Sequence, residues 1–143
     1  MEIQTADKHR ATVVTLLKAE KLLTDDLPES LENFVVATDA EGVIGVAGLE
    51  VYGQYGLLRS VAVRADKRDR GIAKELIKEI EALATGKGLT ELFLLTETAS
   101  VYFGRKGYEQ ISRAEVPAEV QASSEFSYAC PQSAIVMKKK LTL

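Results

Sequence analysis

The chain has 143 residues, 46% of them hydrophobic, and a formal net charge of -3 from 18 basic and 21 acidic residues. Its basic residues are scattered, which argues against a nucleic-acid binder, and its apolar stretches are shorter than the roughly 20 residues that span a bilayer. With one cysteine and one histidine, the chain offers neither an internal disulfide nor a His-rich metal cluster, so we predict no metal.

The first third of the chain is expected to hold a strand, a helix and a hairpin. Residues 2–5 can form a short strand, and Ala6–Leu22 repeats apolar residues at helical spacing. The turn-forming stretch TDDLPES follows, in which Pro28 opens a second short helix or a loop. Phe34–Thr38 and Val43–Val51 flank a turn, which predicts a β-hairpin.

The middle of the chain alternates strands and helices. Leu57–Val63 is apolar and strand-like, and Ile72–Thr85 is an amphipathic helix with Gly86 at its end. Leu89–Thr96 predicts the next strand. The stretch ASVYFGRKG predicts a short helix that ends at Gly107.

The last third predicts two strands around a polar segment. Tyr108–Val116 is the first strand, residues 117–131 are polar and poorly periodic, and Ala134–Leu141 is a final strand whose edge can pair with a second copy in a homodimer. Cys130, in the polar segment, is expected to be an ordinary, at least partly buried thiol. Because hairpins and helical crossovers are mixed, we expect an α/β fold with a mixed sheet and helices on its faces. The N-terminus lacks a secretory signal, so one cytoplasmic domain over residues 1–143 is expected, with no nucleic-acid or membrane partner.

The join between the strand Leu57–Val63 and the helix from Ile72 has the composition of an anion site. It reads Arg68-Asp69-Arg70-Gly71-Ile72-Ala73, so cations and a glycine precede the unpaired amides of a helix start. A glycine lets a phosphate approach the backbone closely, and the arginines add charge-assisted donors. The alternative is a solvated, charged loop.

Together with the order of elements and the segment TETASVYFGRKGY, this hexapeptide resembles the Gcn5-related N-acetyltransferase (GNAT) superfamily. The resemblance implies a mixed, mostly antiparallel GNAT-type sheet of six to seven strands flanked by about four helices. It also implies that acetyl-CoA is the cosubstrate. The other glycine-rich stretch, Gly42–Gly48, lacks the spacing of a dinucleotide motif and is interpreted as turn and packing glycines.

The same resemblance assigns residues to the cofactor, with a strand amide among Val61–Val63 polarising the thioester carbonyl. The implied cofactor residues are Val61, Ala62, Val63, Arg68, Asp69, Arg70, Gly71, Ile72, Ala73, Lys74, Thr96 and Phe103. Thr96 stands where the family often has an asparagine, and Phe103 stands where many members have the tyrosine that protonates the departing thiolate. Tyr102 is the candidate general acid, with Ser100, solvent and the amine itself as alternatives.

A narrower resemblance, carried by TDDLPESLENFVVA, GLEVYGQYGLLRSVAV, LLTETA, GYEQISRAEVP and EFSYACPQSAIVM, is to the short arsenic-resistance N-acetyltransferases of the ArsN type. It implies that the acceptor is a small amine, with an arsenical or a glutamate-like amino acid as candidates. Glu50 is the candidate base, and Arg59 is the candidate contact for an anionic group of the acceptor. The alternative is that Glu50 and Arg59 form a structural ion pair.

The leading prediction is therefore an enzyme, an acetyl-CoA-dependent N-acetyltransferase acting on a small molecule. Two rivals remain. One is a regulatory module that binds acetyl-CoA with reduced catalysis, which Phe103 favours, and the other is an acetyltransferase that modifies proteins.

Overall fold

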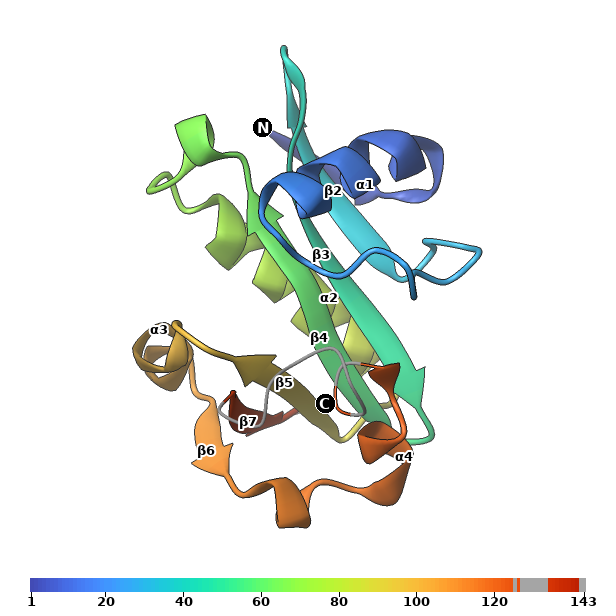
Figure 1. Cartoon of the computed structure of the whole chain (residues 1–143), viewed down its shortest axis with the longest axis vertical. Helices are drawn as coiled ribbons and strands as arrows, with labels where there is room; N and C mark the ends of the chain where they lie inside the picture. Colours follow the sequence, from blue (N-terminus) through green and yellow to red (C-terminus); the bar gives the residue numbers. More distant parts are fainter. Residues whose placement is uncertain (125, 127–133, 142–143) are drawn as a thin grey trace. The chain divides into compact units, whose positions relative to one another are not determined.

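The computed structural model describes residues 1–124, 126 and 134–141 (Figure 1). The strands are β1 (Glu2–Thr5), β2 (Phe34–Asp39), β3 (Gly42–Tyr52), β4 (Tyr55–Val63), β5 (Glu91–Thr96), β6 (Glu109–Ile111) and β7 (Ile135–Lys140). The helices are α1 (Arg10–Ala19), α2 (Ile72–Gly86), α3 (Ser100–Arg105) and α4 (Ala118–Gln121), with 3-10 turns η1 (Asp7–His9), η2 (Ala65–Lys67) and η3 (Arg113–Glu115).

The strands form one seven-stranded mixed sheet in the order β1-β2-β3-β4-β5-β7-β6. The pairs β1–β2, β2–β3, β5–β7 and β6–β7 are antiparallel, whereas β4 and β5 pair in parallel with Tyr55 opposite Glu91. A parallel pair requires a crossover, which α2 supplies. The predicted α/β fold with a mixed, mostly antiparallel sheet is confirmed. The prediction that the last strand forms an edge is wrong, because β7 lies between β5 and β6.

The chain divides into two compact units. Unit 1 comprises Met1–Leu49 and Leu58–Leu83, and unit 2 comprises Glu50–Leu57 and Ala84–Leu143. Each unit has an apolar cluster of its own. The cluster of unit 1 joins side chains of α1 to those of the first strands, namely Ala6, Val13, Leu16, Leu17, Leu31, Phe34, Val36, Val43, Val46 and Ala62.

In unit 1, α1 and α2 cover opposite faces of the strands, and two glycines of β3 make this close packing possible (Figure 1). A Cβ at Gly45 would lie 2.9 Å from Leu76 Cδ1 and 3.1 Å from Ile72 Cγ2, both on α2. A Cβ at Gly48 would lie 2.6 Å from Cζ of Phe34. The interpretation of these residues as packing glycines is confirmed.

The predicted helix Ala6–Leu22 is shorter in the structure. It begins as the 3-10 turn η1 and its α-helical part ends at Ala19. Lys21 adopts a left-handed φ of 62°, and the amide of Leu22 donates to the carbonyl of Leu17 at 2.9 Å. This six-to-one bond is the Schellman closure of a helix end, and here a lysine takes the place of the usual glycine. The stretch after Pro28 contains turns and no helix.

The predicted strand Tyr108–Val116 is also shorter. Only Glu109–Ile111 pairs, because Ser112 and Glu115 form a capping box that starts the turn η3. The helix α4 lies in the segment predicted to be irregular. Its residue Val120 is buried in the cluster of unit 2, which consists of Leu57, Phe93, Val116, Val120, Phe126 and Val136. Cys130 lies outside the described residues.

The packing at Gly48 can be tested directly. Gly48→Ala should lower the free energy of unfolding by about 1–3 kcal/mol, because the added methyl group must displace the ring of Phe34. Urea unfolding followed by circular dichroism measures this change. Gly86→Ala is the matched control, since a Cβ there meets nothing within 4 Å and alanine favours the helix. Equal midpoints for Gly48→Ala and the wild type would contradict the proposed close approach.

Candidate functional site

The loop between β4 and α2 adopts a backbone that favours glycine. Asp69 has a φ of 64° and Gly71 has a φ of 77°, both in the left-handed region. A Cβ on Gly71 would meet nothing within 4 Å, so space is open beside this residue. The backbone conformation therefore favours glycine at position 71, and the open space beside it leaves room for a ligand.

The start of α2 offers amides and positive charge beside that space. The amide of Glu75 donates a helical hydrogen bond to the carbonyl of Gly71 at 3.2 Å. The amides of residues 72–74 come before this bond, at the helix start, where backbone amides lack a partner within the helix. Arg70 and Lys74 are exposed, whereas the side chain of Ile72 is buried. From Ile72 only the backbone can serve a ligand. The helix has 15 residues, and its dipole adds to the attraction for an anion.

Arg68 has a partner that its position in the sequence does not suggest. Its guanidinium forms an ion pair with the carboxylate of Glu20, the residue that follows α1. The arginine side chain remains half exposed, at 51%, and that of Glu20 is 22% exposed. A phosphate that binds Arg68 through Nη2 must therefore compete with Glu20. The two residues are 48 positions apart, and no local pattern connects them.

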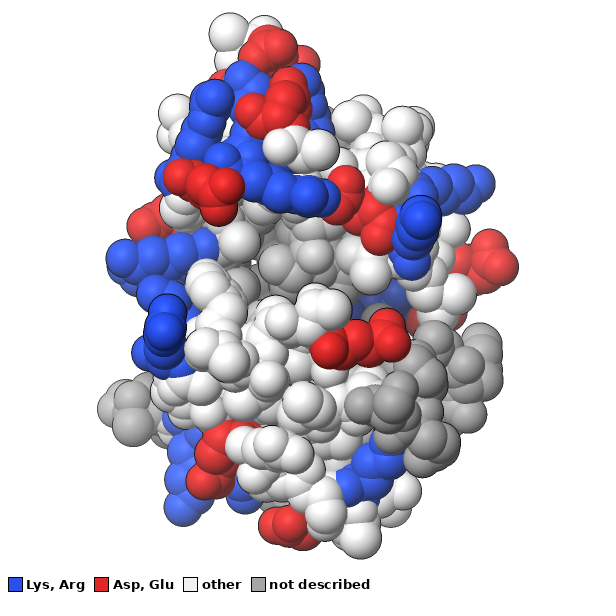
Figure 2. All heavy atoms as spheres, turned by 60° about the vertical axis from the view of Figure 1, so that its left-hand side comes forward, with Lys and Arg blue, Asp and Glu red and all other residues white. Residues whose placement is uncertain are grey.

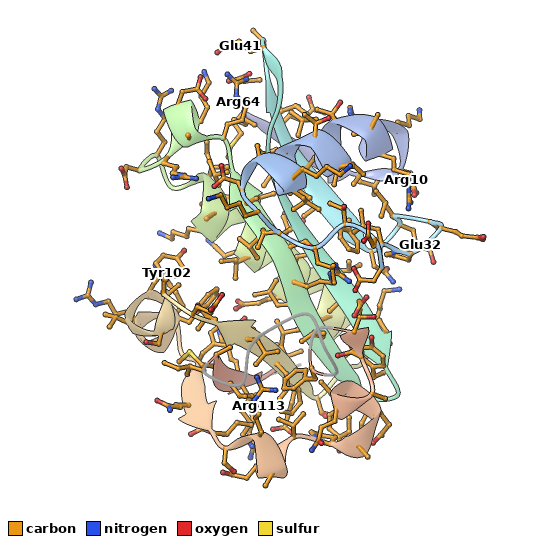
Figure 3. The ribbon with its side chains drawn as sticks, viewed as in Figure 1. Arg10, Glu32, Glu41, Arg64, Tyr102 and Arg113 are labelled. Atoms are coloured by element: carbon orange, nitrogen blue, oxygen red, sulfur yellow. The ribbon has the colours of Figure 1, made fainter. Side chains whose placement is uncertain are left out.

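A second group of charges ties the tip of the β2–β3 hairpin to the start of the loop (Figure 3). Lys67 pairs with Glu41 and, at 3.3 Å, with Asp39, while Arg64 pairs with Asp66 at 2.7 Å. The Glu41 amide lowers the pKa of Asp39, and the hydrogen bond from Arg64 lowers the pKa of Asp66. Figure 2 shows acidic and basic side chains intermixed at this upper end. The charges of Lys67 and Arg64 are thus balanced locally.

The strand β4 contains an irregularity just before the residues implied for the thioester. Ser60 is buried and has a φ of 58°, although it is neither a glycine nor in a turn. Such a conformation costs about 1–3 kcal/mol and persists where surrounding contacts hold it. After it, Val61 and Val63 are half-buried and Ala62 is buried.

Arg59, the predicted contact for the acceptor, is only 3% exposed and binds Asp26. Its Nη1 donates to Oδ2 of Asp26 at 2.7 Å, and its Nη2 donates to Oδ1 at 2.8 Å. Its Nε donates to Oγ of Ser60 at 2.9 Å. The role predicted for Arg59 in holding the acceptor stays a prediction, and Asp26 is a partner that sequence reasoning missed.

The remaining predicted residues belong to unit 2. Glu50 is half-buried near the end of β3, and the hydroxyl of Tyr52 donates to its Oε1 at 2.7 Å. Thr96 ends β5, where its Oγ1 accepts a hydrogen bond from the amide of Ala99 at 2.9 Å. Thr96 therefore shapes the turn into α3, and its own hydroxyl proton can still be donated.

The two aromatic residues of α3 have different surroundings. Phe103 is 8% exposed and packs edge-on against Tyr102 and Tyr108, with ring centroids 5.3 Å and 5.4 Å away. Tyr102 is 36% exposed and projects from α3, with Nζ of Lys106 located 5.6 Å from its ring centroid (Figure 3). The hydroxyl-bearing side chain is thus the accessible one, and Phe103 serves the packing of unit 2.

The predicted residues therefore fall into two sets. Unit 1 contains Arg59, the backbone of Val61–Val63 and the loop Arg68–Lys74, while unit 2 contains Glu50, Thr96, Tyr102 and Phe103.

In the described part of the chain, no group of three or more His, Cys, Asp or Glu side chains is arranged to hold a metal ion. Among residues 1–124, 126 and 134–141, no helix has the length and apolar character needed to cross a membrane.

Comparison with known proteins identifies relatives. Residues 30–110 match the family model of the acetyltransferase (GNAT) domain. The chain is 30% identical over 101 residues to an uncharacterized N-acetyltransferase, CT2212, of Chlorobaculum tepidum, covering 70% of this chain and 64% of that protein. It is 34% identical over 96 residues to an amino-acid acetyltransferase of Ectopseudomonas mendocina, covering 64% of this chain and 22% of that protein. The chain thus spans less than two thirds of either relative.

Solved structures share the fold. One is N-acetylglutamate synthase from Neisseria gonorrhoeae, complexed with coenzyme A and N-acetyl-glutamate. It aligns with a TM-score of 0.81 at 19% identity, and the alignment covers 99% of this chain and 35% of the synthase chain. Another is Rv2747 from Mycobacterium tuberculosis, in complex with CoA. It aligns with a TM-score of 0.84 at 24% identity, and the alignment covers 99% of this chain and 100% of the Rv2747 chain.

The pair formed by Glu20 and Arg68 predicts a measurable competition. Glu20→Gln should lower the dissociation constant of coenzyme A about two- to fivefold, because an exposed ion pair of modest strength no longer holds Arg68. Isothermal titration calorimetry measures it. Glu79→Gln, on the exposed face of α2, makes the same change in net charge and should have less effect. Equal effects of the two variants would assign the gain to net charge alone.

Proposed function

Because the chain belongs to the GNAT acetyltransferase family, we propose that it transfers an acetyl group from acetyl-CoA to the amine of a small molecule, acting as a single acetyltransferase domain. The observation that carries the proposal is the loop between β4 and α2. There a left-handed Gly71 with open space beside it precedes a helix start flanked by Arg68 and Arg70. This combination suits a pyrophosphate.

The residues of this loop fit coenzyme A in their chemistry. The amides of Arg70 to Lys74 would bind the pyrophosphate, and the guanidinium groups of Arg68 and Arg70 would add charge-assisted donors. The backbone of Val61–Val63 would lie along the pantetheine arm. Of the two other residues that the resemblance assigns to the cofactor, Thr96 would contribute its hydroxyl, and Phe103 would contribute only the small apolar surface that its packing leaves exposed.

When bound, acetyl-CoA supplies the acetyl group as a thioester. An amide of Val61–Val63 would donate a hydrogen bond to the carbonyl of this thioester and so favour attack on it. Glu50 accepts the proton of the acceptor ammonium, directly or through water, and the hydrogen bond from Tyr52 orients its carboxylate. Tyr102 is the proposed donor to the departing thiolate, with Ser100, solvent and the amine as alternatives.

For the acceptor, we propose the α-amine of a small amino acid with an anionic terminus. The amino-acid acetyltransferases among the relatives support this class, and the arsenical acceptor rests on the sequence resemblance alone. The guanidinium of Arg59 is buried and bound to Asp26, so a contact with the acceptor would have to come from the N–H groups that this ion pair does not use.

One rival function is favoured by a specific observation. Phe103 carries no hydroxyl and is packed between Tyr102 and Tyr108, so it cannot protonate a thiolate. A protein that binds acetyl-CoA and regulates a partner would need no such group. The test is to assay the release of coenzyme A with a panel of amines that includes glutamate-like and arsenical amino acids. A protein that binds acetyl-CoA but releases no coenzyme A with any of them would favour this rival.

Acetyl-CoA should stabilise the chain. At about 100 times its dissociation constant it should add roughly 2.7 kcal/mol to the free energy of unfolding, which a thermal scan detects as an upward shift of the midpoint. Gly71→Asp should abolish the shift, because it places a carboxylate beside the pyrophosphate.

Gly88→Asp is the matched control, since Gly88 has the same φ of 77° and also meets nothing within 4 Å. It therefore imposes the same backbone strain away from the loop and should retain the shift. No shift for the wild type would refute the proposed cosubstrate.

The roles of Glu50 and Tyr102 predict separate kinetic defects. Glu50→Gln should lower kcat with little change in KM, and Tyr102→Phe should slow the chemical step by about 10²-fold. Steady-state kinetics with the best amine of the panel measure both. Glu109→Gln, an exposed acid on β6, should behave as the wild type. Normal turnover by either site variant removes that residue from the proposed mechanism.

A further inference from the structure

Asp26, in the segment between α1 and β2, is joined to β4 by a chain of buried polar contacts. Its carboxylate accepts two hydrogen bonds from the guanidinium of Arg59, at 2.7 Å and 2.8 Å. The side chains of Arg59 and Asp26 are only 1% and 8% exposed. A bidentate pair in this setting fixes both position and orientation, because rotating the guanidinium would break both bonds.

The same guanidinium holds the irregular residue of β4. Arg59 Nε donates to Oγ of Ser60 at 2.9 Å, and Ser60 is the residue with a left-handed φ of 58°. A serine in that conformation within a strand requires contacts that hold it there. The bond from Arg59 is such a contact, and Asp26 fixes the direction from which it comes. We name Asp26, Arg59 and Ser60 the β4 latch.

The latch lies directly before the backbone that our proposed function assigns to the thioester. The conformation of Ser60 sets the direction in which the strand continues, and therefore the direction of the amides of Val61–Val63. A polarising amide must point at the carbonyl oxygen within a narrow range of distance and angle.

We propose that Asp26 is a positioning residue for acetyl transfer, acting through Arg59 and Ser60 on the thioester-binding amides of β4. The inference rests on the proposed function. A purely structural ion pair would affect the stability of unit 1 and leave the polarisation of a bound thioester unchanged, so the two roles can be separated.

The deciding measurement is the carbonyl stretching frequency of acetyl-CoA labelled with ¹³C at the thioester carbonyl, recorded by infrared difference spectroscopy on the protein-bound cosubstrate. Hydrogen bonding to the carbonyl lowers this frequency, and no acceptor amine is needed. Wild type should show the lowered frequency, and Asp26→Asn should lose most of the shift while still binding acetyl-CoA. Asp25→Asn, an exposed neighbour, should match the wild type.

A rescue variant separates positioning from stability. Glycine adopts a positive φ without strain, so Asp26→Asn combined with Ser60→Gly should recover the wild-type frequency although the hydrogen bond from Arg59 is absent. In turnover, Asp26→Asn should lower kcat by up to about 10²-fold, with the KM for acetyl-CoA little changed.

Ser60→Ala, which removes only the hydroxyl, decides the question if Asp26→Asn fails to fold, and it should lose part of the shift. A wild-type frequency in folded Asp26→Asn or in Ser60→Ala would overturn the proposal, as would a double variant that stays as defective as Asp26→Asn. Failure of the wild type to bind acetyl-CoA would instead refute the proposed function, and this inference with it.

Discussion

The direct contact of α2 with β3 at Gly45 is the constraint on which the candidate site depends. Because no side chain stands between them, Leu76 and Ile72 approach the strand backbone and the first turn of the helix is held against the sheet. Ile72 is therefore both a core residue and the first residue of the helix. Gly71, directly before it, is exposed and has a left-handed φ of 77°, which glycine adopts without strain.

Charge around that helix start is balanced in two different ways. Lys67 and Arg64 are neutralised by acids of the hairpin tip and of the loop itself, which anchors the loop. Arg68 is paired with Glu20, whereas Arg70 and Lys74 remain exposed beside the open space at Gly71. The structural charges thus hold the loop in shape, and the exposed ones are available to a ligand.

Buried polar contacts have a comparable role in β4. A bidentate ion pair buried in unit 1 carries a desolvation cost, so its net contribution to stability is small compared with the cost of breaking it. Its value lies in geometry, because it orients Ser60 and the strand that follows. The aromatic contacts of Phe103 in unit 2 are likewise structural, and they leave Tyr102 as the accessible phenol of α3.

Local chemistry allowed the sequence by itself to predict the strands and helices that form the site, the glycine at the helix start and the family. Periodicity, turn residues and motif spacing all act within a few residues, so they can be read without the fold. The predicted ends of two elements were wrong because the residues there are not the usual signals. A lysine, Lys21, takes the left-handed position at the end of α1, and a capping box at Ser112 ends β6 early. Only the tertiary structure decided that Arg59 binds Asp26 and that Arg68 binds Glu20, because these partners are 33 and 48 residues apart and meet only when the sheet and α1 are assembled.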